Sequence, residues 1–296
     1  MASVSAVVLN WNNAPETVAC LRSLTRTRNC ALSLLVIDNG STDDSVASIK
    51  VGWPDAKLIE TGSNLGYAEG NNTGIRAALS GGADFVFVIN NDARVAADTL
   101  DRLARAAEAV PDAAFLGPTI YHLERPEEVQ SRGMDLDLLW RSRPRTEPPG
   151  RRSGEFEDVP CLSGAAMLLR ASALDRIGLL DASLFMYRED VDWCMRARRL
   201  GYRILCVPEA RAWHRSDHAR QDELPRITYY MTRNSLSLLS KHAGGPVRLT
   251  ALLARFALTA LSWTVRPRWR EKGAERDALV LGVVDFLRGK TGCGYA

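Results

Sequence analysis

The chain has 296 residues, of which 46% are hydrophobic and 25% charged, a composition typical of a globular enzyme. Its 38 basic and 35 acidic residues nearly balance, which argues against nucleic acid as the main partner. The six cysteines show no CxxC pair or metal-finger spacing, and no charged leader precedes the first apolar run. These features favour a reducing cytoplasm as the location of the protein.

The N-terminal third alternates between strand-like and helix-like segments. Apolar runs rich in β-branched residues predict strands at residues 5–9, 32–37, 57–60 and 85–89. Helical periodicity predicts helices at residues 15–25, 43–50, 70–80 and 99–109. This alternation predicts an α/β fold with a mostly parallel sheet flanked by helices, which binds its ligand at the carboxyl ends of the strands.

Three of the predicted strands end in clusters of polar residues. The clusters occupy residues 10–13, residues 38–44, and the triplet of Asn90, Asn91 and Asp92. Each cluster alone has the ordinary composition of a loop or helix cap. Parallel strands present their carboxyl ends at one edge of the sheet, so the three clusters together favour a binding site.

A segment rich in glycine and asparagine, residues 61–74, leads into one of the predicted helices. Glycine lets the backbone approach a ligand closely, and the start of a helix offers free amides to phosphate oxygens. The segment therefore predicts a diphosphate or sugar site. It matches neither the P-loop nor the dinucleotide fingerprint, which disfavours a P-loop NTPase and a nicotinamide enzyme.

These blocks and three later ones resemble the inverting glycosyltransferases of family two, in particular the bacterial rhamnosyltransferase-like branch. They are, in chain order, VVLNWN at 7–12, VIDNGSTD at 36–43, NLGYA at 64–68, NND at 90–92, CLSGAAMLLR at 161–170, FMYREDVDWCMR at 185–196 and AWH at 212–214. The resemblance covers about residues 3–240, and seven blocks in family order make a chance match hard to obtain.

The resemblance implies a GT-A fold, the fold of nucleotide-diphospho-sugar transferases, with a mostly parallel central sheet. We expect this domain at residues 1–240, with a nucleotide-sugar-binding half at 1–115 and an acceptor and catalytic-base half at 116–240. Residues 241–296 are expected to form a helical C-terminal extension.

In the family, the catalytic base lies in the Glu-Asp pair that corresponds to Glu189 and Asp190. The resemblance makes Asp190 the base and leaves Glu189 to orient the acceptor or a neighbouring basic group. The residues that follow predict a helix closed by Gly201, whose start would lower the pKa of Asp190, whereas nearby apolar side chains would raise it. The alternative is that Asp190 is only an acidic residue at the start of a helix.

The resemblance also implies a divalent cation, Mg²⁺ or Mn²⁺. Asp92 corresponds to its main protein ligand, and Asn90 stands where the family usually has an acid, which predicts weaker or water-mediated coordination on that side. His214 is the second candidate ligand, and imidazole suits Mn²⁺ better than Mg²⁺. The alternative for His214 is an ordinary surface histidine, and His218 is the comparison for any substitution there.

For the nucleotide, Asp38 matches the family aspartate that binds the base, and Asn10 is expected to line the same pocket. The ribose and diphosphate are expected beside Asn64, Gly66, Asn71 and Asn91, together with Asp92. Rhamnose from dTDP-rhamnose is the leading donor by resemblance, and UDP- and GDP-linked sugars stay open. The acceptor would be a hydroxyl group on a glycan, a lipid-linked saccharide or a natural product.

Two other classes of protein remain. A sugar nucleotidyltransferase would share the sheet and an acidic metal site, but its N-terminal glycine-rich loop with a following arginine and lysine is missing from the sequence. A non-catalytic nucleotide-sugar-binding protein would not need Asp190, which is present. The enzyme is therefore favoured.

Two further segments have alternative interpretations. Residues 141–154 contain three prolines and five arginines, and predict a loop that either clamps an anionic acceptor or is plain surface. Residues 248–265 are apolar, but they are shorter than a bilayer span and are interrupted by Arg255. They predict a helix that packs on the catalytic domain or on a second subunit, and the basic residues that follow leave peripheral contact with anionic lipid open.

Overall fold

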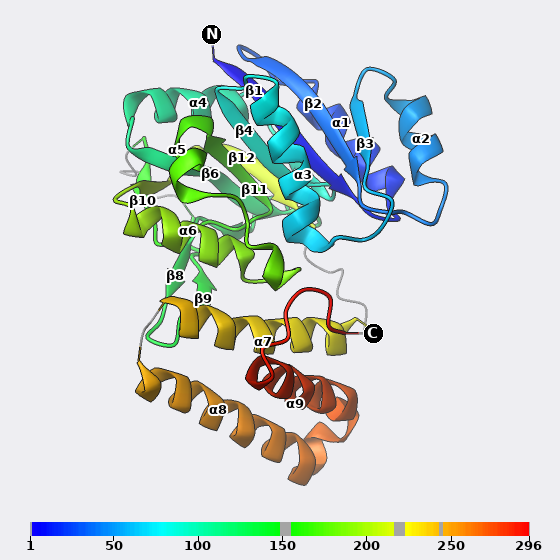
Figure 1. The fold of residues 1–296 in the computed structure, drawn as a ribbon. Coiled ribbons are helices and arrows are strands. Elements are labelled where there is room, and N and C mark those ends of the chain that lie inside the picture. The colour runs from blue at the N-terminus through cyan, green and yellow to red at the C-terminus, as the bar shows by residue number, and fades with distance from the viewer. Residues whose placement is uncertain (1, 149–154, 216–222, 243–244, 296) are drawn as a thin grey trace.

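The computed structural model describes residues 2–148, 155–215, 223–242 and 245–295. A ten-stranded sheet runs through the molecule in the order β10-β12-β6-β11-β4-β1-β2-β3, with β5 beside β12 and β7 beside β6 (Figure 1). Three helices lie together beneath it at the C-terminal end of the chain (Figure 1).

The first half of the chain confirms the predicted alternation of strands and helices. One element differs, because the helix predicted at residues 70–80 begins at Gly66, where the side-chain oxygen of Asn64 accepts a 2.9 Å hydrogen bond from the Gly66 amide. The elements are β1 (Ser3–Asn10), α1 (Ala14–Leu24), β2 (Ala31–Asp38), α2 (Ser45–Gly52), β3 (Lys57–Glu60), α3 (Gly66–Ser80), β4 (Phe85–Asn90), β5 (Ala93–Val95) and α4 (Thr99–Ala109).

The second half of the catalytic domain adds antiparallel strands to the sheet. Strand β11 lies between β4 and β6 and runs antiparallel to both, whereas β12 runs parallel to β6. The elements are β6 (Ala113–His122), β7 (Val129–Ser131), β8 (Met134–Leu136), β9 (Ser142–Pro144), β10 (Glu157–Asp158), β11 (Ala166–Arg170), α5 (Ala171–Ile177), η1 (Ala182–Leu184), α6 (Glu189–Arg199) and β12 (Arg203–His214).

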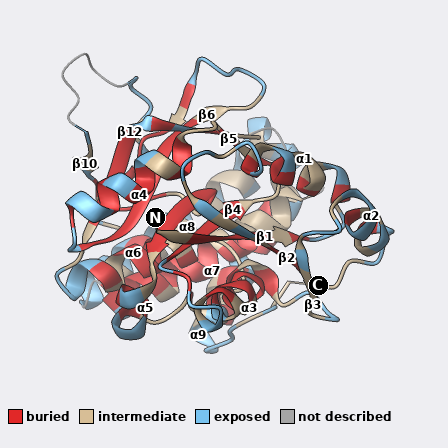
Figure 2. Cartoon of the chain, turned by 90° about the horizontal axis from the view of Figure 1, so that it is seen from above, coloured by how far each residue is buried: buried red, intermediate tan, exposed pale blue. Residues whose placement is uncertain are grey.

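Helices cover both faces of the sheet, because alternate residues of each central strand point to opposite sides. Val4, Ala6 and Val8 of β1 pack in one apolar cluster with side chains of α1, α2 and α4. Val7 packs on the other face with side chains of α3, α5 and α6. The central strands are consequently buried, as Figure 2 shows.

The C-terminal helices are α7 (Leu224–His242), α8 (Pro246–Val265) and α9 (Gly273–Leu287), with the short helix η2 (Pro267–Lys272) before α9. Helix α7 lies nearest the catalytic domain, and α8 is the outermost helix in Figure 1. None of the helices in the described ranges is long and apolar enough to cross a membrane.

The segment 141–154 is not a simple loop. Residues Ser142–Pro144 form β9, which pairs antiparallel with β8, so the arginines at its start are fixed on a hairpin. Residues 149–154, like His218, lie outside the described ranges.

The order of the strands places several polar residues at one edge of the sheet. The chain leaves β1 for β2 on one side and later returns to β4 on the other, so the ends of β1, β2 and β4 flank a topological switch point. Since β12 runs in the same direction as β4, its last residue, His214, reaches the same edge. Antiparallel β11 begins there, which brings Gly164 to the edge as well.

Candidate active site

A cavity of about 240 Å³ opens at this edge of the sheet. Four of the predicted binding residues line it, namely Asn64, Gly66, Asn91 and Asp92. The rest of the lining is formed by Leu9, Trp11, Asn13, Asn39, Tyr67, Asn90, Phe185, Met186 and Arg226. A larger hollow of about 850 Å³ is lined by residues near the opposite ends of the strands and by none of the predicted site residues.

Asp92 and His214, the two candidate metal ligands, lie side by side next to the cavity. The Nε2 atom of His214 lies 3.3 Å from Oδ1 of Asp92 and 3.2 Å from the side-chain nitrogen of Asn90. On the other side of the imidazole ring, Oε1 of Gln130 lies 3.0 Å from Nδ1. Because Oε1 can only accept a hydrogen bond, a proton on Nδ1 would satisfy this contact, and Nε2 is the nitrogen that faces Asp92.

This donor set fits a hard divalent cation. A carboxylate and an imidazole nitrogen lie side by side, and the buried Oδ1 atom of Asn90 has no hydrogen-bond partner among the described residues. The described part of the chain holds no group of three or more His, Cys, Asp or Glu side chains that could bind a metal. The other positions around a cation would therefore be filled by substrate oxygens, Asn90 or water.

Asn10 and Asp38 are brought together, but behind the wall of the cavity. Both side chains are buried, and the side-chain nitrogen of Asn10 donates a 2.9 Å hydrogen bond to Oδ1 of Asp38. The Ser41 backbone amide donates to the other carboxylate oxygen of Asp38 at 3.0 Å. In this arrangement the two residues fix the loops after β1 and β2.

Asn71 does not reach the cavity. Its buried side chain donates a 2.9 Å hydrogen bond to the carbonyl oxygen of Tyr67, one turn earlier in α3. The helix begins at Gly66 rather than at residue 70, so Asn71 lies in its second turn rather than at its start.

Asn39, which the sequence analysis missed, organises the glycine-rich segment. Its side chain donates to Oδ1 of Asn64 and to the carbonyl oxygen of Gly66, both at 3.1 Å, and accepts from the Leu65 amide at 3.0 Å. Gly66 has φ of +80°, and a Cβ atom there would lie 2.5 Å from the ring of Phe185. Only glycine fits this close approach of the two segments.

Asp190 lies at the start of α6, behind Tyr67 and Gly164. Its Oδ2 atom accepts a 3.1 Å hydrogen bond from the Gly164 amide, and its Oδ1 atom accepts a 2.7 Å bond from the Val191 amide. The Tyr67 hydroxyl, which lines the cavity, donates to the Gly164 carbonyl at 2.8 Å. Gly164, just before β11, therefore connects the Asp190 carboxylate to Tyr67 in the wall of the cavity.

Burial dominates the electrostatics of the carboxyl pair. It raises the pKa of Asp190, and the hydrogen bonds from Gly164 and Val191 only partly oppose it. Burial, with the nearby charge of Asp190, raises the pKa of Glu189 to about 8. Two opposing effects on the pKa of Asp190 are expected from the sequence, and burial is the larger of them. Because the pKa of Glu189 is about 8, the pair retains a proton at neutral pH.

The backbone before this pair is strained. Phe185, Tyr187 and Arg188 all have positive φ, between 64° and 75°, which side chains other than glycine rarely adopt. The side-chain nitrogen of Asn234 in α7 holds this turn, because it donates to the carbonyl oxygens of Leu184, Met186 and Tyr187 at 2.8, 2.8 and 2.9 Å.

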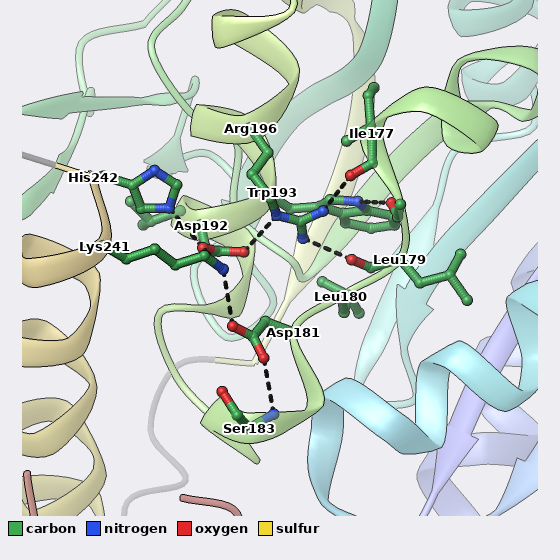
Figure 3. A network of polar contacts seen from close by, with 12 residues as sticks. Ile177, Leu179, Leu180, Asp181, Ser183, Asp192, Trp193, Arg196, Lys241 and His242 are labelled. Carbon is green, nitrogen blue, oxygen red and sulfur yellow. Dashed lines mark hydrogen bonds and ion pairs between the residues drawn. The ribbon is translucent and has the colours of Figure 1, made fainter. Parts of the chain in front are cut away.

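A second contact ties α7 to the other end of the same segment (Figure 3). The buried carboxylate of Asp192 accepts from Nε2 of His242 at 2.6 Å and from Nε of Arg196 at 2.8 Å, and Lys241 pairs with it at 2.7 Å. These contacts hold the pKa of Asp192 well below its usual range, although burial opposes them. Helix α7 therefore contacts the chain both before and after Glu189 and Asp190.

The α/β/α architecture and the acidic site at its switch point define a glycosyltransferase of the GT-A fold. Among solved structures, the mannosyltransferase PcManGT from Pyrobaculum calidifontis, in complex with GDP-Man and Mn²⁺, matches this chain with a TM-score of 0.58 and 17% sequence identity. The match covers 97% of this chain and 87% of that one.

The chain belongs to the family described as glycosyltransferase like family 2, whose sequence model matches residues 2–233. It is 29% identical over 268 residues to the N-acetylglucosaminyl-diphospho-decaprenol L-rhamnosyltransferase of Mycobacterium tuberculosis, covering 82% of this chain and 87% of that relative. It is 23% identical over 308 residues to the dTDP-rhamnosyl transferase RfbF of Shigella flexneri, covering 99% and 98% of the two chains.

Proposed function

We propose that the protein is an inverting glycosyltransferase that moves rhamnose from dTDP-rhamnose to a hydroxyl group of a lipid-linked saccharide. The observation that carries the proposal is the convergence of Asp92 and His214 on one cavity, with Asp190 behind its wall. The donor and the acceptor rest on the names of the two rhamnosyltransferase relatives.

Asp190 is the proposed base. Inversion requires the acceptor hydroxyl to lose its proton as it attacks the anomeric carbon of the donor from the side opposite the diphosphate. A carboxylate whose pKa is raised by burial is a stronger base than an exposed one, and it accepts that proton more readily. Glu189, whose pKa is raised to about 8, is neutral at pH 7 and serves to orient the acceptor.

Asp92 and His214 would hold the divalent cation, Mg²⁺ or Mn²⁺. When bound, the cation supplies positive charge that neutralises the leaving diphosphate. Gln130 would orient the imidazole so that Nε2 is available for binding, and the side-chain amide of Asn90 lies next to Nε2 with its buried oxygen free of hydrogen bonds to the described residues. The mannosyltransferase neighbour was solved with Mn²⁺, which supports the choice of a divalent ion.

The nucleotide is proposed to bind along the ends of β1 and β2. Asn64, Gly66 and Asn91 line the cavity and would contact the ribose and diphosphate. Trp11 is 41% exposed at the mouth of the cavity, with the guanidinium group of Arg226 over its ring at 5.6 Å, and is available to stack on a base. Asp38 would reach the base only if its bonds with Asn10 and Ser41 rearranged.

We also propose peripheral attachment to an anionic membrane, which would suit a lipid-linked acceptor at the cytoplasmic surface. The outward face of α8 is apolar, with Val247, Leu258, Leu261 and Val265 between 56% and 79% exposed. Three exposed arginines, at 266, 268 and 270, follow the helix. Flotation with anionic and neutral liposomes tests this, and a homodimer covering the same face would instead appear in sedimentation analysis.

The domain division proposed from the sequence places a catalytic domain at residues 1–240 and a helical extension at 241–296. The proposed boundary between the two halves of the catalytic domain, after residue 115, falls within β6 (Ala113–His122). The boundary after residue 240 falls within α7 (Leu224–His242).

The central experiment measures nucleotide release from dTDP-, UDP- and GDP-linked sugars, with and without Mn²⁺, on the wild-type protein and on Asp190→Asn. We expect turnover with dTDP-rhamnose that needs the cation and is lost in the variant. Turnover indifferent to both the metal and Asp190 would refute the mechanism. Incorporation of the nucleotide into a sugar phosphate would instead indicate a nucleotidyltransferase.

A further inference from the structure

A second cavity, of about 290 Å³, lies between the C-terminal helices and the strained turn before Glu189. Arg188 lines this cavity, whereas Met186, two residues earlier, lines the candidate donor cavity. The turn therefore forms part of the wall of both. The apolar part of the second lining includes Met231 of α7 and three residues of α8, namely Leu252, Phe256 and Trp263.

Arg188 brings a positive charge to this cavity and forms no direct ion pair with any described residue. Its side chain is only 8% exposed, and it donates to two neutral hydroxyl groups, Ser235 at 3.2 Å and Ser142 at 2.9 Å. Within the described ranges, no carboxylate lies within ion-pair distance of it. Burial lowers the pKa of Arg188, and the charges of Asp190 and Asp137, which lie beyond ion-pair distance, only partly oppose this effect. An anion bound beside it would offset the cost of burying this charge.

Two more arginines line the same cavity. Arg255, from α8, is exposed and forms no ion pair with any residue that the structure describes. Arg141, at the end of the β8–β9 hairpin, is paired with Asp137 at 2.6 Å. The cavity thus combines an apolar lining with two guanidinium groups, those of Arg188 and Arg255, that form no direct ion pair with a described residue. Guanidinium groups bind phosphate oxygens through paired hydrogen bonds, and the apolar side chains suit a hydrocarbon.

We propose that this cavity binds the diphosphate and the first isoprenoid units of the acceptor. The proposal rests on the transfer to a lipid-linked saccharide proposed above and names where that acceptor's lipid end binds. Arg188 is two residues from Asp190, so their Cα atoms are at most about 7 Å apart, and the charge of Asp190 acts on the Arg188 guanidinium group. A diphosphate on Arg188 and Arg255 therefore brings the sugar attached to it close to the base, so the sugar next to the diphosphate receives the transferred residue.

The test measures binding of farnesyl diphosphate to the full-length protein by calorimetry, in excess dTDP to block the donor cavity. We expect farnesyl diphosphate to bind more tightly than either inorganic pyrophosphate or farnesol, because only the first has both an anionic and an apolar part. Arg255→Ala should weaken its binding about 10- to 100-fold, the range expected for loss of a charged hydrogen bond. Arg248→Ala, two turns earlier on the same helix, should leave it unchanged.

Arg188→Gln provides a second variant and should weaken binding to a similar degree. The proposal is overturned if neither Arg255→Ala nor Arg188→Gln changes the affinity, or if dTDP abolishes binding. It is also overturned if vesicles of anionic phospholipid, but not farnesyl diphosphate, show the dependence on Arg255, because the site would then bind lipid headgroups. Binding that depends on Arg255, in a protein that turns over no sugar nucleotide, would refute the proposed function and leave the cavity assignment standing.

Discussion

The side-chain amide of Asn234 donates a 2.9 Å hydrogen bond to the carbonyl oxygen of Tyr187, two residues before the proposed catalytic pair. Tyr187 has a positive φ, so its conformation is one that the local sequence does not favour. The contact means that a residue of the C-terminal helices, with no part in the chemistry, sets the position of Glu189 and Asp190.

Asn234→Ala should therefore lower kcat by about 100-fold, the size of effect expected when a reacting group is displaced by about 1 Å. The KM for the donor should rise much less than kcat falls, because Asp92 and His214 are held by other elements. Steady-state kinetics measure both. Ser237→Ala is the matched control, since that hydroxyl only contacts the Arg233 carbonyl one turn away in α7. Equal effects of the two variants would argue against a positioning role.

Glu189→Gln should remain active at neutral pH, whereas Asp190→Asn should not. The pKa of Glu189 is raised to about 8, so its side chain is protonated at pH 7 and glutamine resembles that form. The pH profiles of kcat for the wild type and Glu189→Gln measure this. A variant as inactive as Asp190→Asn at pH 7 would show that Glu189 acts as a charged group.

The substitution Glu189→Gln should also change the thermal stability of the protein, in a way that depends on pH. An acid whose pKa is raised on folding stabilises the protein below its unfolded pKa, about 4.3, and loses that contribution as the pH rises through the folded value of about 8. Thermal unfolding of the wild type and Glu189→Gln should therefore coincide near pH 4, and the variant should melt at a higher temperature at pH 9. A gap that is constant across this range would contradict the raised pKa.

Gln130→Ala should weaken binding of Mn²⁺ in the presence of dTDP by about 10- to 100-fold, the usual cost of losing a group that orients a ligating histidine. Gln130 Oε1 lies 3.0 Å from His214 Nδ1 and fixes which imidazole nitrogen is free. The unbound fraction of Mn²⁺ can be followed by electron paramagnetic resonance. Gln130→Glu keeps the acceptor and should retain most of the affinity. Unchanged binding in Gln130→Ala would remove His214 from the metal site.

His242→Ala should destabilise the protein by about 1.5–3 kcal/mol, because the buried carboxylate of Asp192 loses one hydrogen-bond donor but keeps Arg196 and Lys241. Urea denaturation measures the change, and Lys50→Ala, which breaks an exposed pair with Glu60, should cost less than about 1 kcal/mol. The pKa of Asp192 is lowered on folding, so the difference between wild type and His242→Ala should shrink as the pH falls below about 4.

The sequence predicts the sheet because the relevant signals are local. Each strand of the first half is an apolar run, and the resemblance to family two adds the order of the blocks. The meeting of Asp92 and His214 also follows from that resemblance. The physical cause of this meeting is the sheet topology. Strand β12 runs parallel to β4, with two strands between them, so both end at the same edge of the sheet.

Other parts of the site leave no local signal. Gln130 and Asn234 act through contacts with residues far along the chain, and neither lies in a recognisable pattern. The resemblance predicts Asn71 beside the ribose and diphosphate as part of the glycine- and asparagine-rich segment, whereas α3 begins at Gly66 and holds Asn71 in its second turn. The pKa of Glu189 depends on burial that only the packed structure defines.

The hydrogen bonds between Asn234 of α7 and the strained turn before Glu189 have a consequence for biosynthesis. Asn234 leaves the ribosome 48 residues after Met186, whose carbonyl it binds, and His242 follows later still. The sheet can form while α7 is still being made, but the turn before Glu189 cannot be fixed until that helix has emerged. A nascent chain would thus form its sheet before its base is in place, and the donor cavity, whose wall includes Met186 of this turn and Arg226 of α7, would be completed at the same late stage.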